Sequence, residues 1–116
     1  MTENTLKITG YHAHVYYEAS SQDKAEILRA ALIEQFPTAV VGNWHDEPIG
    51  PHLDPMYQVA FEIPLYRDIV PWLALNRDGL NVLVHPRTGE SAADHTVRAI
   101  WLGERLAVKY DLEDHD

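Results

Sequence analysis

The chain has 116 residues, which fits one domain, and its 46% hydrophobic content argues against disorder. It contains no cysteine, which excludes disulfides and thiolate metal sites and leaves imidazole and carboxylate groups as possible metal ligands. The net charge of −9 disfavours nucleic acid as a partner, because phosphates require a basic surface.

The sequence shows neither the pattern of a signal peptide nor an apolar stretch long enough to span a membrane. We therefore expect a cytoplasmic protein with no membrane partner. A single domain should occupy residues 1–116, with flexible ends at 1–9 and 111–116, the second of which is strongly acidic.

Two strands and one helix are expected in the N-terminal half. The segment YHAHVYY alternates as strands do and places His12, His14 and Tyr16 on one face. A serine pair offers the helix its N-cap, and Pro37 ends it. The expected elements are a strand at 11–17, a helix at 20–36 with Ile27, Leu28, Ala31 and Leu32 as its apolar stripe, and a strand at 38–44.

The C-terminal half begins with a loop, HDEPIGPHLDP, which is rich in proline, glycine and aspartate. Pro71 restricts the next helix, since proline is tolerated only in the first turn or at a kink. Pro86 should end a strand, because it cannot donate to a ladder. The expected elements are strands at 56–63 and 80–85, a helix within 65–76, a short helix at 94–102 and a last strand at 106–110.

The order β-α-β-β-α-β is the ferredoxin-like split βαβ pattern of an α+β sandwich, here with a short C-terminal extension. Its two helices would cover one sheet face and leave the other to solvent, a ligand or a second subunit. We therefore expect a homodimer, formed through the open face or the extra strand.

Seven histidines are distributed along the chain, and their placement is more informative than their number. His12 and His14 lie two apart on a strand, so both project from the face opposite the helices. The fourth strand should lie antiparallel beside the first, with His85 on that same face. Three imidazoles there suit a metal site. The alternative is a polar face whose histidines meet water or a partner subunit.

Two more histidines are candidates for the same site. His52 follows a proline that stiffens its loop, although an exposed turn histidine is the alternative. Asp94 could orient His95 as carboxylates orient metal ligands, or it could only cap a helix. His45 and His115 lie in acidic, loop-like segments, and we interpret both as structural or solvated.

The segments YHAHVYY, GPHLDPMYQVAF and VLVHPRTGESAADHTVRAIWLG resemble the small DOPA 4,5-dioxygenase family of fungi and bacteria, over residues 11–103. The resemblance implies extradiol cleavage of a catechol such as DOPA by O₂ at a non-haem iron(II) site. A crystal could hold zinc or nickel there instead. The motifs HxH, GPH, HPxTG and DH imply functional positions at His12, His14, His52, His85 and His95.

Within this set we predict metal ligation by His14, His52 and His85, with His12 in place of His52 as the rival set. His12 and His95 are then predicted as acid–base or orienting groups. The usual extradiol triad has two histidines and a carboxylate. Glu18 is a candidate for that carboxylate, and a site with three histidines is the other option.

Four residues are candidates for contacting the substrate. Tyr16 and Tyr57 could wall the ring pocket together with Trp101, for which core packing is the alternative. Arg87 could meet a substrate carboxylate, or it could be a loop arginine that faces solvent.

Two other functions fit the same scaffold. A cofactor-free monooxygenase predicts apolar residues at the histidine positions, which the sequence does not show. A non-catalytic protein that binds a metal or ligand predicts tight metal binding without oxygen uptake, and it stays open as an alternative.

Overall fold

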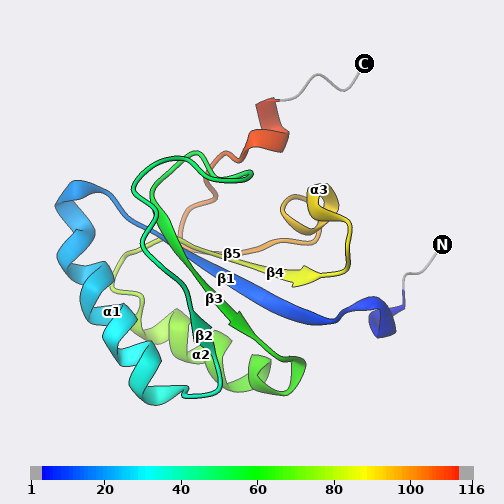
Figure 1. Ribbon diagram of the computed structural model, residues 1–116, viewed down its shortest axis with the longest axis horizontal. Helices are drawn as coiled ribbons and strands as arrows, with labels where there is room; N and C mark the ends of the chain where they lie inside the picture. Colours follow the sequence, from blue (N-terminus) through cyan, green and yellow to red (C-terminus); the bar gives the residue numbers. More distant parts are fainter. Residues whose placement is uncertain (1–3, 113–116) are drawn as a thin grey trace.

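A five-stranded antiparallel sheet, in the order β2-β3-β1-β4-β5, is the frame of the computed structural model, which describes residues 4–112 (Figure 1). The α+β class is as predicted. The elements are β1 (Gly10–Tyr16), α1 (Gln22–Gln35), β2 (Val40–Val41), β3 (Met56–Phe61), α2 (Tyr66–Asn76), β4 (Val82–Arg87), α3 (Ser91–Asp94) and β5 (Ile100–Leu102). Short 3₁₀ turns lie at Thr5–Lys7, Ala19–Ser21, Ile63–Leu65 and Lys109–Leu112.

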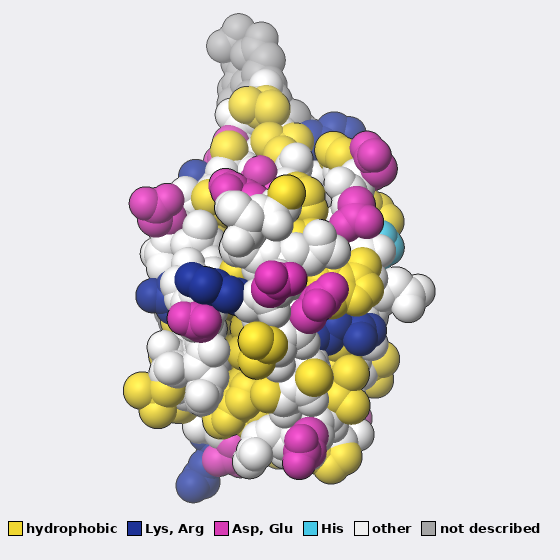
Figure 2. All heavy atoms as spheres, turned by 90° about the vertical axis from the view of Figure 1, so that its left-hand side faces the viewer, with side chains coloured by type: hydrophobic (Ala, Val, Ile, Leu, Met, Phe, Trp, Pro, Cys, Tyr) yellow, Lys and Arg dark blue, Asp and Glu magenta, His cyan; other side chains and the backbone are white. Residues whose placement is uncertain are grey.

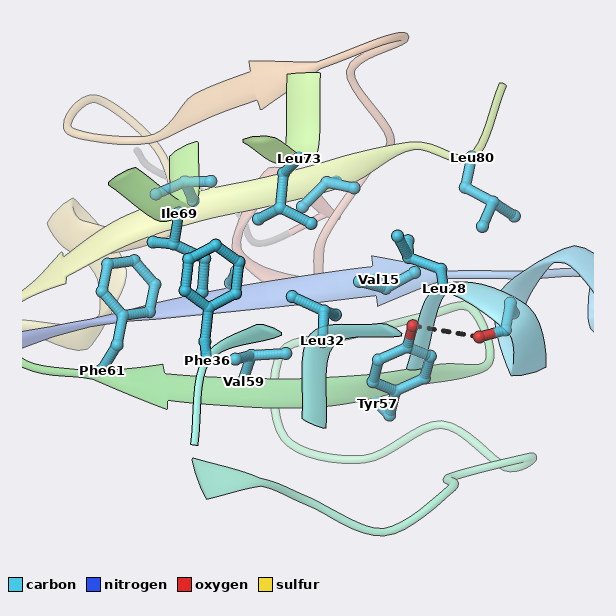
Figure 3. Close-up of a cluster of buried hydrophobic side chains, with 14 of the residues drawn as sticks. Val15, Leu28, Leu32, Phe36, Tyr57, Val59, Phe61, Ile69, Leu73 and Leu80 are labelled. Carbon is cyan, nitrogen blue, oxygen red and sulfur yellow. Dashed lines mark hydrogen bonds between the residues drawn. The ribbon is translucent and has the colours of Figure 1, made fainter. Parts of the chain in front are cut away.

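The main core lies between the sheet and the helices α1 and α2, which cover one of its faces (Figures 1 and 3). Alternate strand residues fill it, as period-two patterning requires. The Tyr57 hydroxyl donates to the Ala25 carbonyl at 3.1 Å inside this core. The strand residues of the core are Ala13, Val15, Tyr57, Val59, Phe61, Val82 and Val84.

Of the four residues predicted for the apolar stripe of α1, Leu28 and Leu32 are buried, Ala31 is half-buried and Ile27 is not buried. Ala25, Leu28 and Leu32 are buried, whereas Ile27 is 73% exposed. Successive helix residues are turned by about 100°, so Ile27 faces solvent beside the stripe. Figure 2 views the molecule from the side of α1 and shows hydrophobic side chains among acidic and basic ones.

The strand β4 continues through Pro86 to Arg87, so the prediction that Pro86 ends it is wrong. The Tyr16 amide donates to the Asn81 carbonyl, so Tyr16 and Asn81 form a hydrogen-bonded pair of the ladder. In an antiparallel ladder hydrogen-bonded pairs alternate with pairs that make no hydrogen bond. The Tyr11–Pro86 pair, five positions away, therefore makes no ladder bond, and β1 does not need the missing N–H. On its other side β4 pairs with β5 only through Val82–Val84.

Other expected elements are shorter or absent. The strand expected at 38–44 is reduced to β2, and Pro71 lies past the first turn of α2 with its side chain exposed. The helix expected at 94–102 is wrong, because Ile100–Leu102 instead extends the sheet beside β4. The strand expected at 106–110 is an isolated bridge, Val108 to His52, followed by a 3₁₀ turn.

The sheet face opposite the helices, expected to be open, is partly covered by the chain itself. The loop before β3, the helix α3 and the segment after β5 lie over it (Figure 1). Leu106 and Trp101 pack there against Tyr16, Met56 and Leu83. This second, small core leaves less of the face for a partner subunit.

Parts of both terminal segments lie within the described residues. Residues 4–9, expected to be flexible, include a 3₁₀ turn, and Lys7 forms an ion pair with Glu90 at 2.7 Å. Asp111, within the other expected flexible end, pairs with Arg105 at 2.7 Å. His115 lies outside the described residues. Among the described residues, no helix is long and apolar enough to cross a membrane.

Candidate metal centre

Three histidines of the two central strands share the sheet face opposite the helices. His12 lies directly across from His85 in the β1–β4 register, and His14 is two residues further along β1. The predicted pairing of the first and fourth strands is therefore confirmed. Because side chains alternate along a strand, all three imidazoles lie on one face of the sheet. Nε2 of His14 lies 3.1 Å from Nε2 of His85.

Two more histidines reach this group from outside the central strands. His52 is held by bridges to Ile49 and Val108, and its ring centre lies 4.1 Å from that of His14. His95 directly follows α3, and its ring centre lies 4.0 Å from that of His85. All five histidines selected from the sequence thus come together.

Backbone carbonyls fix the tautomer of two rings. Nδ1 of His85 lies 2.7 Å from the Pro86 carbonyl oxygen, and Nδ1 of His95 lies 2.8 Å from that of Ser91. A carbonyl only accepts, so each Nδ1 carries the proton and donates. In the neutral rings Nε2 then keeps its lone pair, which is the state in which imidazole ligates a metal or takes up a proton.

Burial keeps these imidazoles neutral. His14, His52, His85 and His95 are at most 8% exposed, and His12 is half-buried. Burial lowers the pKa of His12 and of His85 to about 4, and that of His52 to about 3. The same cause lowers the pKa of His14 and His95. Near neutral pH the cluster therefore offers uncharged nitrogen ligands.

Two compact sets of three nitrogens could each hold a cation. One set is His12, His14 and His85, and the other is His14, His52 and His95. In both sets the ligand atoms lie within 4.8 Å of one another. The predicted trio of His14, His52 and His85 is not one of these sets, whereas the rival trio with His12 is the first of them.

The residues present fit a metal. Nδ1 of His14 is buried and has no hydrogen-bond partner, which is costly unless an ion or water satisfies it. The donor set consists of neutral imidazoles, which suit iron, copper or zinc. Neither set contains a carboxylate. Glu18, the candidate carboxylate, is exposed and lines a separate cavity of about 290 Å³.

Tyr16 contacts the site from the buried side and does not form the wall of its opening. Its hydroxyl lies 2.7 Å from Nδ1 of His52, and its ring stacks on Trp101 at 5.6 Å. Tyr16 is 4% exposed. Because Nδ1 is engaged, only Nε2 of His52 is available to the other histidines.

Tyr57 does not belong to the site. It lies on the helix-facing side of the sheet and is fully buried in the main core. This placement removes it from the residues expected to bind substrate. His45 forms an isolated bridge with Met56 and belongs to neither set of three, in agreement with a structural role.

A cavity of about 430 Å³ opens beside the cluster. Three histidines line it, His12, His85 and His95, together with Arg87. His14 and His52 lie deeper and do not line it. The remaining lining residues are Thr9, Thr88, Gly89, Ser91 and Asp94.

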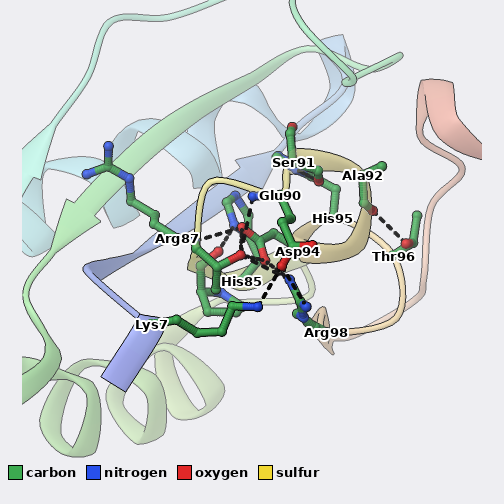
Figure 4. Close-up of polar contacts among 12 residues, drawn as sticks. Lys7, His85, Arg87, Glu90, Ser91, Ala92, Asp94, His95, Thr96 and Arg98 are labelled. Atoms are coloured by element: carbon green, nitrogen blue, oxygen red, sulfur yellow. Dashed lines mark hydrogen bonds and ion pairs between the residues drawn. The ribbon is translucent and has the colours of Figure 1, made fainter. Parts of the chain in front are cut away.

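A clamp around Asp94 holds the segment that presents His95 (Figure 4). Its carboxylate accepts from the Thr88 amide at 2.9 Å and hydroxyl at 2.8 Å, and from Arg98 at 3.0 Å. Burial would raise the pKa of Asp94, but these hydrogen bonds together lower it. Asp94 thus neither orients the His95 ring nor only caps a helix. The i,i+4 spacing of Asp94 and Arg98 was the sequence signal for this clamp.

Comparisons with known proteins show the family to which this chain is related. A family model described as the Dopa 4,5-dioxygenase family matches residues 11–112. The chain is 33% identical to an uncharacterised 21.2 kDa protein of Botryotinia fuckeliana, over 88% of this chain and 62% of that protein. It is 29% identical to DOPA 4,5-dioxygenase of Amanita muscaria, over 84% of this chain and 46% of that protein. It thus spans under two thirds of the length of either relative.

A solved structure is similar over almost the whole chain. The crystal structure of a "putative dioxygenase" from Nostoc punctiforme PCC 73102 has a TM-score of 0.91 and 48% identity, covering 95% of each chain. Together with the family match over residues 11–112, these similarities show the relationship plainly. The chain belongs to the Dopa 4,5-dioxygenase family.

Proposed function

We propose that this protein is an extradiol dioxygenase that opens the ring of a catechol such as DOPA with O₂ at a non-haem iron(II) site. The observation that supports it most is the buried cluster of neutral histidines beside a cavity of about 430 Å³. The histidines would hold an iron(II) ion, which would supply open coordination positions and the redox chemistry that joins a catechol to O₂.

We propose His12, His14 and His85 as the ligands. Two of these three line the cavity, whereas only His95 of the other set does, so the first set is the one a substrate in the cavity can reach. A neutral imidazole has one free lone pair, so His14 can serve only one set at a time. This choice exchanges His52 for His12 relative to the trio predicted from the sequence.

We propose His95 as the general base. Its Nδ1–H donates to the Ser91 carbonyl, so its unprotonated Nε2 is free to take the proton of a catechol hydroxyl. Burial lowers the pKa of His95, which keeps it unprotonated near neutral pH. His52, anchored by Tyr16, is then an orienting group on the far side of His14.

The proposal extends to the fold class and the assembly. Two helices on one face of a sheet with the strand order β2-β3-β1-β4 support the ferredoxin-like class.

We keep the homodimer as a proposal, and gel filtration tests it. Elution as a lone 13.2 kDa chain would contradict it.

Oxygen consumption tests the function. Protein loaded anaerobically with iron(II) is mixed with DOPA and a panel of simpler catechols, and a yellow ring-opened product is followed. We expect uptake with at least one catechol, its loss in His14→Ala and its retention in His45→Ala. Bound iron without uptake on any catechol would favour the non-catalytic binding protein instead.

A further inference from the structure

The cavity beside the histidines contains one charged side chain that the protein does not neutralise. Of its lining residues only Arg87 and Asp94 are charged, and Asp94 is engaged by Thr88 and Arg98. Among the described residues, the guanidinium of Arg87 has no ion pair. Figure 4 shows its side chain running away from Lys7, Glu90 and Arg98.

Arg87 is placed to reach the part of a substrate that lies away from the metal ligands. It follows His85 by two residues on β4, so its side chain leaves the same sheet face, about 7 Å further along the strand. Arg87 therefore lies at the end of the cavity beyond the two ligands that line it.

The charges of the site leave a place for one anionic group. Neutral imidazoles do not reduce the charge of a divalent cation, and a fully deprotonated catechol would balance it. A further negative group on the substrate would then need its own counter-ion. Guanidinium offers a planar pair of donors that matches a carboxylate.

We infer, on the basis of the proposed function, that this cavity selects catechols that carry a carboxylate on the side of the ring away from the hydroxyls, and that Arg87 binds this carboxylate. Arg87 is thus a specificity-determining residue. The same charge should disfavour catechols with a cationic substituent, such as dopamine. Arg87 is exposed to solvent, so the preference is limited to roughly tenfold for one charge-assisted contact.

Calorimetry on zinc-loaded protein measures this preference without turnover. The probes are 3,4-dihydroxybenzoate and its neutral amide, 3,4-dihydroxybenzamide, which differ in charge and hardly in shape. We expect roughly tenfold tighter binding of the acid, a ratio near one in Arg87→Gln, and an intermediate ratio in Arg87→Lys. Arg67→Gln is the matched control, because it removes an exposed arginine of α2, outside the cavity.

The outcomes are distinct from those of the oxygen assay. Equal affinity for acid and amide, no binding of either, or a preference that survives in Arg87→Gln would overturn the role of Arg87. Each of these results is possible in a protein that still cleaves neutral catechols. Conversely, selective acid binding without oxygen uptake would support the carboxylate site and contradict the dioxygenase.

Discussion

At the scale of single residues, hydrogen bonds decide what each histidine can do. Carbonyl acceptors fix the protonated nitrogen of His85 and His95, whereas His14 has a buried Nδ1 without a partner. The sequence predicted the identity of these histidines, because spacing and motif are local properties. It could not predict their tautomers, since these depend on carbonyls and rings that approach only in the folded chain.

Replacing His14 should abolish metal binding, because His14 belongs to both candidate sets. We expect His14→Ala to weaken zinc or iron(II) affinity by at least about 100-fold, measured by competition with a chromophoric chelator. His45→Ala is the control and should bind metal as the wild type does. Wild-type affinity in His14→Ala would contradict the site.

Removing the Tyr16 hydroxyl should loosen His52 without unfolding the protein. In Tyr16→Phe the ring still packs on Trp101, but Nδ1 of His52 loses its partner. If His52 orients the site, metal affinity should fall by about tenfold. Tyr57→Phe is the control, since it removes another buried hydroxyl on the opposite face and should cost only about 1 kcal/mol of stability. Equal metal affinity in the two variants would count against the orienting role of Tyr16.

At the scale of elements, the strands were predictable and the segments over the site were not. Alternation in β1, β3 and β4 fixes the face of each side chain, so the convergence of His12, His14 and His85 could be predicted. The loop that carries His52 and the turn that carries His95 are positioned by long-range contacts. Residues 94–102 have a helical pattern, yet α3 ends at Asp94, which the clamp holds, and Ile100–Leu102 pairs as a strand with the free edge of β4.

Breaking the Asp94 clamp should destabilise the segment around α3. Asp94→Ala removes the buried acceptor of Thr88 and Arg98 and leaves these donors without it. We expect a loss of about 3 kcal/mol in the free energy of unfolding, measured with urea. Asp68→Ala is the control, because its 4.0 Å pair with Arg67 is exposed and should contribute little. Equal stability of the two variants would contradict the clamp.

At the scale of the whole molecule, the buried histidines link stability to pH. The unfolded chain protonates histidine near pH 6.5, whereas the folded chain holds the pKa of His85 at about 4 and that of His52 at about 3. Between these values the unfolded state binds more protons. The stability that depends on the histidines being neutral is therefore fully present above pH 6.5 and is lost as the pH falls toward 4.

Urea unfolding of the metal-free protein at a series of pH values measures this linkage. We expect the free energy of unfolding to fall by a few kcal/mol between about pH 6.5 and 4, because the folded state resists protonation. Midpoints that do not change over this range would show that the histidines are solvated, and would contradict a buried cluster.

The mass of the product from iron(II)-loaded protein tests the central claim most directly. A ring-cleaving dioxygenase adds both atoms of O₂ to the catechol, so a catechol without an amine should give a product with the mass of substrate plus O₂. With DOPA, whose amine can condense with the new aldehyde, the mass should be that of substrate plus O₂ less one water. In both cases the amount of product should equal the oxygen consumed. Formation of a quinone, which has lost two hydrogens, or no product at all despite bound iron, would contradict the account.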